Sequence, residues 1–485
     1  MGRYQNFHQL RVIICLVAWV ALLASYSQRI NLSIGIIGMV SEKPLKLDND
    51  SNCPIRRSVK SVSFATEHTT NYEWDESMQN YLLLAYNVGY MLGHIPGAFL
   101  ALHFGSRYVM IFSLISSSLL TISSVFIVQF WWLFFFVRVL TGFVNGPVIP
   151  LIHETIAYHS PPDERTVLTM FTHTGNLASL ILILPLGGIL IENYANGWKY
   201  IFIISGLIGV LAAVLWTVLV FSEPEENPWM SKNEQIFINE SIYPNGKPPK
   251  NTIMSVPFKS IFNSRHFYVF TICHFGKLCI LYMNLFGIVK YFYKYYTLSP
   301  RMAGNLAVVP FVADFIFQLM YPQIVVLMKK TGISLTSVRK LNTFIGSFGS
   351  STFLICLGFI SCHDLLYGIV LMSLCSMFLA PYQAGYFTAI IEYAPRYAGI
   401  VYSFVNVGGT FSGVAQRYLM AFLASKIPDL RLAYQYSFII TGFVSFVFSM
   451  VYVIFGTADL QPWAKTGDSS RVYLSRVENK QSEKN

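Results

Sequence analysis

Four positively charged side chains lie inside stretches that are otherwise apolar enough to cross a membrane: Arg29, Arg138, Lys277 and Arg417. Arg138 is the clearest case, because QFWWLFFFVRVLTGFVNG has no acidic residue within a helical turn of it. A charge at bilayer depth costs roughly 3 kcal/mol or more, so such a residue normally faces a polar cavity and marks the path of an ion or ligand. Cations in a cavity predict that the visiting solute is an anion.

The positions of these cations along their helices predict which of them meet. At 1.5 Å per residue, Arg29 lies about 27 Å from the start of its helix and Arg138 about 22 Å from the end of its helix, so the two share one level, with Lys277 somewhat lower. Arginine suits bidentate binding of carboxylate or phosphate, whereas lysine offers a point charge. The alternative is a cation that is neutralised locally and only holds helices together. For Arg417, towards the outer end of its helix, we expect contact with the membrane interface instead.

Acidic residues in the apolar segments are fewer, and Glu154 and Asp314 are the candidates for a coupling site. Coupling a solute to H⁺ or Na⁺ needs a group that changes charge or binds the cation, and a carboxylate in the membrane can do both. For Glu154 the alternative is a local ion pair or simple hydration. His94, His153 and His274 can also titrate, although a single histidine on an apolar helix is more often a packing residue.

Composition places these residues in a membrane protein. Of 485 residues, 54% are hydrophobic and only 12% are charged, and the mean hydropathy is +0.50. Soluble domains carry about 25% charged residues. The net charge of +10 does not indicate a nucleic-acid partner, because the lysines and arginines are spread over short loops. The expected surroundings are a lipid bilayer, and the expected state is a monomer.

Hydropathy predicts an all-α fold of about twelve transmembrane helices. Two connections are long, residues 41–77 and 223–265, and the second divides the helices into two sets of six. We therefore expect a first six-helix bundle in residues 1–222, a central cytoplasmic loop in 223–265, a second bundle in 266–456 and a tail in 457–485. Two such halves are typical of transporters built from repeats.

The distribution of lysine and arginine predicts that both termini are cytoplasmic, with about 19 of these residues on that side and about 11 on the other. The loop 41–77 then lies on the outer side, where Asn49 begins an Asn-Asp-Ser sequon for N-glycosylation. Cys53 and Cys362 are on the same side, and a disulfide between them is an open alternative. The remaining cysteines show no metal-ligand spacing.

Motifs for catalysis are missing from the sequence: it has no GxSxG elbow, P-loop or HExxH. We therefore expect no enzyme, no metal site and no cofactor apart from a coupling Na⁺ or H⁺. Clusters of small residues, such as GYMLGHIPGAF and GFVNGPVIP, allow helices to approach closely.

Several longer strings resemble the major facilitator superfamily and, within it, the anion transporters of solute carrier family 17. They include QRINLSIGIIGMV, GYMLGHIPGAFLALHFGSR, RVLTGFVNG, SPPDER, GWKYIFIISGLIG, EPEENPWMSKNEQIFINESI, TSVRKL, EYAPRYAGIVYSFVNVGGTFSG and TADLQPWAK, in order along nearly the whole chain. The resemblance implies the major-facilitator fold. It also implies a substrate among phosphate, urate and other organic anions, sialic acid, acidic amino acids, glutamate and nucleotides.

The resemblance assigns roles to particular residues. Arg29 matches the family's arginine of the first helix, and Arg138 its arginine of the fourth helix. Lys277 stands where the vesicular glutamate branch has an arginine, and Tyr282 where that branch has a tyrosine on the substrate side. The resemblance thus implies anion contacts for these four residues.

Other positions depart from the family pattern. Asn145 replaces the glutamate of a GxxEG segment, which is the proton-coupling residue of the glutamate and sialic-acid branches, and Asn145 is kept as a candidate substrate contact. Leu83 stands where the glutamate branch has a histidine. His94 occupies the first position of a QxPGG motif, and Leu102 replaces the superfamily's loop acid. These features are nearer to the sodium-phosphate and organic-anion branch, in which a glutamate resembles Glu154.

We therefore expect a secondary transporter of a small anion that works by alternating access and is coupled to Na⁺, H⁺ or voltage. The candidate coupling residues are Glu154, Asp314 and His94, and a uniporter is the alternative. A plasma membrane and a vesicular or lysosomal membrane are both compatible with the sequence. The alternatives are a facilitator-fold sensor or scaffold that does not transport, and a membrane enzyme such as an acyltransferase.

Overall fold

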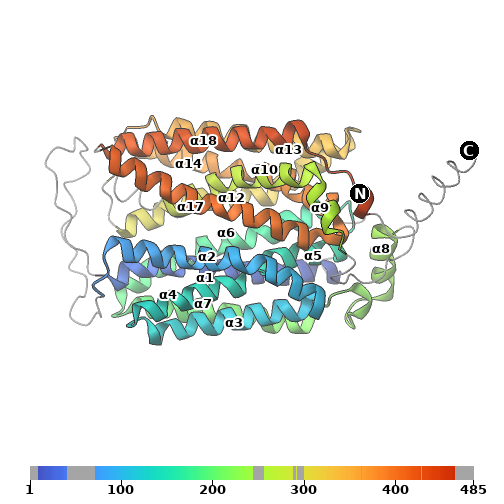
Figure 1. Cartoon of the computed structure of the whole chain (residues 1–485), viewed down its shortest axis with the longest axis horizontal. Coiled ribbons are helices and arrows are strands. Elements are labelled where there is room, and N and C mark those ends of the chain that lie inside the picture. Colours follow the sequence, from blue (N-terminus) through green and yellow to red (C-terminus); the bar gives the residue numbers. More distant parts are fainter. Residues whose placement is uncertain are drawn as a thin grey trace, which may run out of the picture.

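A computed structural model describes residues 9–40, 72–243, 256–287, 291, 296, 300–361, 363–427 and 429–464. Within these ranges the chain is helical, and its one extended pairing is an isolated bridge between Val40 and Tyr72. The long helices run side by side along the longest axis of the molecule (Figure 1). Asn49, Cys53 and Cys362, which carry the predictions of glycosylation and of a disulfide, lie outside the described residues.

The first half of the chain forms six membrane helices. They are α1 (Leu10–Met39), α2 (Glu76–Phe104), α3 (Ser106–Ile127), the pair α4 (Trp131–Asn145) and α5 (Val148–His159), α6 (Arg165–Asn193) and α7 (Gly197–Leu219). The α4–α5 pair is one span, Trp131–His159, with a break at Gly146 and Pro147. In the central loop, a short turn η3 (Pro224–Glu226) leads to α8 (Lys232–Ile242), and α9 (Phe258–Asn263) precedes the second half.

The second half also forms six membrane helices. They are α10 (Arg265–Tyr282) with the π-helical turn η5 (Met283–Gly287), α12 (Pro300–Lys330), α13 (Leu335–Leu357), the series α14 (Leu365–Met377), α15 (Leu379–Tyr382), η6 (Gln383–Phe387) and α16 (Thr388–Tyr393), then η7 (Pro395–Tyr397) with α17 (Ala398–Lys426), and α18 (Leu430–Phe455). A last turn, η8, spans Pro462–Ala464. The π-helical turn η6 contains Gly385, whose φ and ψ of −82° and −118° are not helical.

The prediction of twelve transmembrane helices in two bundles is confirmed. Ten spans in the described residues are long and apolar enough to cross a membrane by length and hydropathy alone. The other two, α2 and α13, are 29 and 23 residues long. They are more polar because each turns a hydrogen-bonding face inward, with Asn87 and His94 on α2 and Arg339 and Asn342 on α13 all buried.

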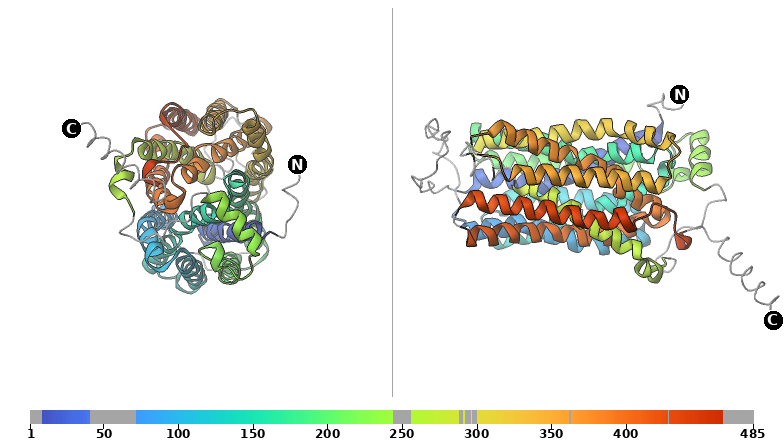
Figure 2. Two further views of the ribbon diagram at one scale, coloured as in Figure 1. Left: turned by 90° about the vertical axis from the view of Figure 1, so that its right-hand side faces the viewer. Right: turned by 90° about the horizontal axis from the view of Figure 1, so that it is seen from above.

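The two bundles meet mainly along three helix pairs. Within the first half, α1 packs on α6 and α7, and α2 on α4; within the second half, α10 packs on α17 and α18, and α13 on α18. Between the halves, α6 packs on α12, and both α2 and α5 pack on α17. The end-on view separates the blue-to-green first half from the yellow-green-to-red second half (Figure 2).

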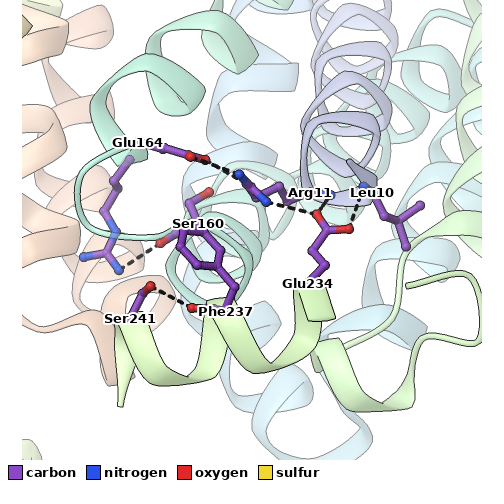
Figure 3. Close-up of polar contacts among 8 residues, drawn as sticks. Leu10, Arg11, Ser160, Glu164, Glu234, Phe237 and Ser241 are labelled. Atoms are coloured by element: carbon purple, nitrogen blue, oxygen red, sulfur yellow. Dashed lines mark hydrogen bonds and ion pairs between the residues drawn. The ribbon is translucent and has the colours of Figure 1, made fainter. Parts of the chain in front are cut away.

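The helix α8 lies across one end of the molecule, here named the α8 end (Figure 1). Ser231 caps α8 by accepting a hydrogen bond from the backbone N–H of Glu234. The Glu234 carboxylate in turn accepts hydrogen bonds from the backbone N–H groups of Leu10 and Arg11 at the start of α1, over 3.0 and 3.1 Å. The Arg11 side chain bridges Glu234 and Glu164, which precedes α6 (Figure 3). The central-loop helix is thereby fixed to the first half.

Glycines bring α2 and α4 into backbone contact. A Cβ added at Gly142 would lie 2.0 Å from the carbonyl oxygen of Tyr86, and one at Gly89 would lie 1.8 Å from that of Val139. This approach lets the side chain of Arg138, on α4, reach α1 past the Tyr86 ring. These small residues therefore set the spacing between α2 and α4, the helix that carries Arg138.

Replacing Gly142 by alanine should lower the unfolding temperature, because the added methyl group overlaps backbone atoms that cannot move independently. Overpacking of this kind typically costs about 1–3 kcal/mol. Thermal unfolding of the purified protein in detergent measures the effect. The matched control is Gly188→Ala on α6, where an added Cβ meets no atom within 4 Å; equal unfolding temperatures for the two variants would contradict the close approach.

Candidate anion site between the two halves

Arg29 lies in α1 at the boundary between the halves and is 7% exposed. Its Nη2 atom donates hydrogen bonds to Oδ1 of Asn87, on α2, and to the hydroxyl oxygen of Tyr282, on α10, each over 2.7 Å. Four tyrosine rings surround the guanidinium carbon with centroids 5.0–5.9 Å away: Tyr26, Tyr86, Tyr90 and Tyr282. Such rings stabilise a cation through their electron-rich faces.

No carboxylate among the described residues is paired with Arg29. Its Nη2 atom donates to the neutral groups of Asn87 and Tyr282, and its Nε–H has no partner. A buried cation without a counter-ion favours the binding of an anion, because the anion provides the compensating negative charge. Asn87 comes from the first half and Tyr282 from the second, so the site draws on both.

Arg138 lies behind Arg29 and is 1% exposed. It donates hydrogen bonds to the backbone carbonyl of Gln28 over 3.1 Å, to Oδ1 of Asn31 over 3.0 Å and to the carbonyl of Arg29 itself over 3.4 Å. The expectation that Arg29 and Arg138 share one level is therefore confirmed. In this conformation Arg138 fastens α4 to the stretch of α1 that presents Arg29.

Asn145 belongs to the same buried layer. Its Nδ2 donates to Oε1 of Gln28 over 2.9 Å, and Gln28 in turn donates to the hydroxyl of Ser118 over 3.1 Å. Its Oδ1 atom has no hydrogen-bond partner. Asn145 thus supports the segment of α1 that carries Arg29, from the same side as Arg138.

Lys277 and Asp314 form a second group, inside the second half. The Nζ atom of Lys277 donates to Oε1 of Gln383 over 3.1 Å and lies 4.9 Å from the centroid of the Phe387 ring. Asp314, on α12, accepts a hydrogen bond from Gln318 over 3.2 Å and interacts electrostatically with Lys277. The charge of Lys277 is therefore partly compensated, unlike that of Arg29.

Arg417 is placed differently from the expectation of an interfacial residue. It is half-buried on α17, and its guanidinium lies within electrostatic reach of Arg29 and Tyr282. A third cation therefore faces the same region from the second half. The position of Arg417 along its helix did not predict this placement, because that position does not determine the direction in which a side chain points around the helix axis.

A cluster of histidines lies between the Arg29 level and the α8 end. Asn406, on α17, is hydrogen-bonded to His94 of α2 over 2.9 Å and to His274 of α10 over 2.8 Å. His153, on α5, stacks on Tyr402 with a centroid separation of 4.1 Å. His173, which no sequence pattern singled out, lies with its ring centroid 5.4 Å from that of His153. The spacing of Asn87, Tyr90 and His94 in the sequence places all three on one face of α2. That pattern is the sequence signal from which part of the histidine cluster could have been predicted.

Glu154 lies apart from both cation groups, towards the α8 end. Its side chain packs against Gly399 of α17, where an added Cβ would lie 3.1 Å from the Glu154 carboxylate. A small cavity at this contact is also lined by Leu102 and Arg396. Glu154 and Asp314 thus lie in separate places, one at the contact between the halves and the other beside Lys277.

The hydrogen bonds that join the two halves within the described residues are concentrated near the α8 end. Arg29 and Tyr282 meet at the level of the site; the others are Asn406 with Tyr90 and His94, Tyr158 with the carbonyl of Arg396, and Arg339 with Thr166. All of these except the first lie between the site and the α8 end. The conformation is therefore closed towards that end.

Arg339 makes the last of these contacts, the hydrogen bond to Thr166. It is fully buried on α13 and makes a two-bond ion pair with Glu392 of α16. Its Nη2 atom also donates to the hydroxyl of Thr166, on α6 in the first half, over 2.7 Å. One guanidinium thus joins two helices of its own half to a helix of the other.

Comparison with known proteins adds a family assignment. A family model described as Major Facilitator Superfamily matches residues 14–416. The chain is 24% identical to human sialin over 459 residues, covering 94% of this chain and 90% of sialin. It is 26% identical to human vesicular glutamate transporter 2 over 468 residues, covering 95% of this chain and 76% of that protein.

Among solved structures, the fold is similar to that of the proton:xylose symporter XylE. The TM-score is 0.67 at 15% identity, with 94% of this chain and 98% of the XylE chain covered. At this identity the likeness concerns the fold alone. The family and the fold are those of transporters, and the membrane-enzyme alternative is set aside on that ground.

Proposed function

Because the chain belongs to the Major Facilitator Superfamily, we propose that it carries a small organic or inorganic anion across a membrane by alternating access to one central site. The observation that supports this substrate class is the state of Arg29. It is buried between the halves, hydrogen-bonded to one residue of each, and paired with no carboxylate of the described chain. A site of that charge binds an anion and repels a cation.

The arrangement suggests how binding would drive the change of conformation. Arg29 belongs to the first half, whereas Tyr282, Lys277 and Arg417 belong to the second. An anion held by Arg29 would attract the cations of the second half, so its affinity would depend on how closely the halves approach. A ligand shifts a conformational equilibrium only through such a difference in affinity. Arg138 and Asn145 would keep Arg29 in position, from behind.

The relatives suggest the first anions to test. One of them is named as a transporter of glutamate, and the resemblance of the motifs to solute carrier family 17 adds phosphate, sialic acid, urate and nucleotides. We propose that transport is coupled to H⁺, Na⁺ or voltage, with Glu154, Asp314 and His94 as candidate coupling residues. The proposed site is a plasma membrane or a vesicular or lysosomal membrane, with both termini in the cytoplasm.

Reconstitution into proteoliposomes tests this proposal. Uptake of radiolabelled phosphate, sialic acid, glutamate, urate and ATP should be measured one at a time, each under imposed pH, Na⁺ and voltage gradients. We expect saturable uptake of at least one of these anions, competition by related anions, and no competition by neutral or cationic solutes of similar size. The gradient that raises uptake identifies the driving ion.

The same experiment separates transport from a sensor or scaffold role. A folded, monodisperse preparation that moves none of the anions under any gradient would contradict the proposed function and favour the scaffold. Competition by neutral sugars as strong as that by anions would also contradict it, because the charge of Arg29 would then have no part in selection.

A further inference from the structure

The amide of Asn406 bridges two buried histidines that belong to different halves. Its Nδ2 atom is 2.9 Å from Nε2 of His94, in the first half, and its Oδ1 atom is 2.8 Å from Nε2 of His274, in the second. His274 continues the chain of hydrogen bonds through Nδ1, which lies 2.8 Å from the hydroxyl of Tyr386. His94, His274 and Asn406 are 0%, 1% and 3% exposed.

The chemistry of an amide limits the protons that this bridge can hold. An amide offers one acceptor atom and one donor atom, so the imidazole facing Oδ1 must carry N–H and the other must present a bare nitrogen. One additional proton fits, because a cationic His274 can donate to Asn406 through Nε2 and to the Tyr386 oxygen through Nδ1. A second proton would place an N–H of His94 against the N–H₂ group of Asn406. The hydrogen bond between the halves would then be lost.

The charged groups around the bridge are the cations Arg29 and Lys277 and the carboxyl group of Asp314, and two further histidines lie nearby. Arg29 acts electrostatically on His94 from α1, and Lys277 acts on His274 from one turn further along α10. His153, on α5, faces both His274 and Lys277, His173 faces Lys277 from α6, and Asp314 faces Lys277 from α12. A proton at the bridge therefore adds charge beside the anion site. An anion between Arg29 and Lys277 would offset that charge, and each ligand would raise the affinity for the other by the same factor.

We propose that His94 and His274, joined through Asn406, form the proton-binding site that couples transport to a pH gradient. This inference rests on the proposed function and specifies its driving ion as H⁺. It assigns the coupling role to a cross-half hydrogen bond instead of to Glu154 or Asp314. Because the bond between Asn406 and His94 is one of those that close the α8 end, protonation of both histidines weakens that closure.

The test measures the conformation as a function of pH with no transported anion present. Spin labels are placed at Tyr108, at the start of α3, and at Ile333, between α12 and α13; these positions are 65% and 45% exposed and lie in different halves at the α8 end. The native cysteines are replaced by serine, and the buffers contain neither phosphate nor carboxylate. Pulsed electron paramagnetic resonance then gives the distance distribution at a series of pH values between about pH 8 and about pH 5, on both sides of the ordinary pKa of histidine, about 6.5.

In the wild-type background we expect acidification to increase the ratio of the long-distance to the short-distance population about tenfold. His94→Gln and His274→Gln should each remove most of this change, since glutamine retains hydrogen bonding but cannot take up a proton. Asn406→Asp offers two acceptor oxygens to two N–H donors and should give a distribution that no longer changes with pH. The matched control is His103→Gln, an exposed position in the last turn of α2, which should keep the wild-type response.

A wild-type distribution that does not change with pH overturns this assignment, and so does a full response in the His94→Gln, His274→Gln double variant. Because no anion is present, these outcomes are independent of the anion panel. Failure of the panel concerns the proposed transport, whereas failure of the pH response concerns the histidine bridge.

Discussion

Replacing Arg29 by alanine should reduce anion uptake about 30- to 4,000-fold while leaving the protein folded. Removing one partner of a buried, hydrogen-bonded charge pair typically costs about 2–5 kcal/mol, and each 1.4 kcal/mol corresponds to about a factor of ten. The loss should be that large because Arg29 is buried between the halves and is paired with no carboxylate of the described residues. Initial rates of uptake into proteoliposomes, measured with the anion that the panel identifies, provide the test.

Two further variants show whether charge or geometry is responsible. Arg29→Lys keeps the charge but cannot present two parallel N–H groups, so we expect a smaller loss than with alanine. Tyr282→Phe keeps the ring beside Arg29 and removes one hydroxyl, so only a few-fold change is expected. Wild-type uptake by the Arg29→Ala variant would contradict the assignment of the site.

Breaking the ion pair between Arg339 and Glu392 should have the second large effect, on stability. Glu392→Gln leaves a fully buried guanidinium without its counter-ion, and removal of one partner of a buried pair costs about 3–5 kcal/mol. We expect a clearly lower unfolding temperature together with a larger population open at the α8 end, because Arg339 also holds Thr166 of the first half. Thermal unfolding and the spin-label distances described above measure the two consequences.

The controls for this prediction separate charge burial from the contact between the halves. Thr166→Ala removes only the cross-half acceptor and should open the α8 end with little loss of stability. Replacing Arg339 and Glu392 together by methionine and leucine should recover much of the stability lost in Glu392→Gln, because no charge is then left buried. An unfolding temperature of Glu392→Gln equal to that of the wild type would contradict the argument.

The sequence was sufficient for the fold because lipid imposes a strong constraint on composition. Spans of about 20 apolar residues identified the helices, and the length of the central connection identified the halves. The polar helices α2 and α13 were harder to recognise because their buried Asn87, His94, Arg339 and Asn342 lower the hydropathy. Those residues are polar because they face other helices within the bundle.

The site was predictable only in part. Counting residues along the helices brought Arg29 and Arg138 to one level, and the structure agrees. The same counting could not show that Arg138 points at the backbone of α1 while Arg29 reaches Tyr282 in the other half. Nor could it select Asn406, a neutral residue whose role depends on histidines more than 130 positions away along the chain. Such contacts follow from the rotation and register of packed helices, which a single sequence does not specify.

The π-helical turn Gln383–Phe387 has a consequence for the helix in which it lies. Such a turn accommodates one more residue than an α-helical turn, and one residue corresponds to a rotation of about 100° around the helix axis. Removing a single residue there would turn everything after it by that angle, carrying Glu392 away from Arg339 while Tyr382, before the turn, stayed against Ser449. The extra residue thus sets the orientation of one end of the helix independently of the other. The extra residue lies between the helix segment that packs within the second half and the segment that contacts the first half. It sets how far one segment is rotated about the helix axis relative to the other.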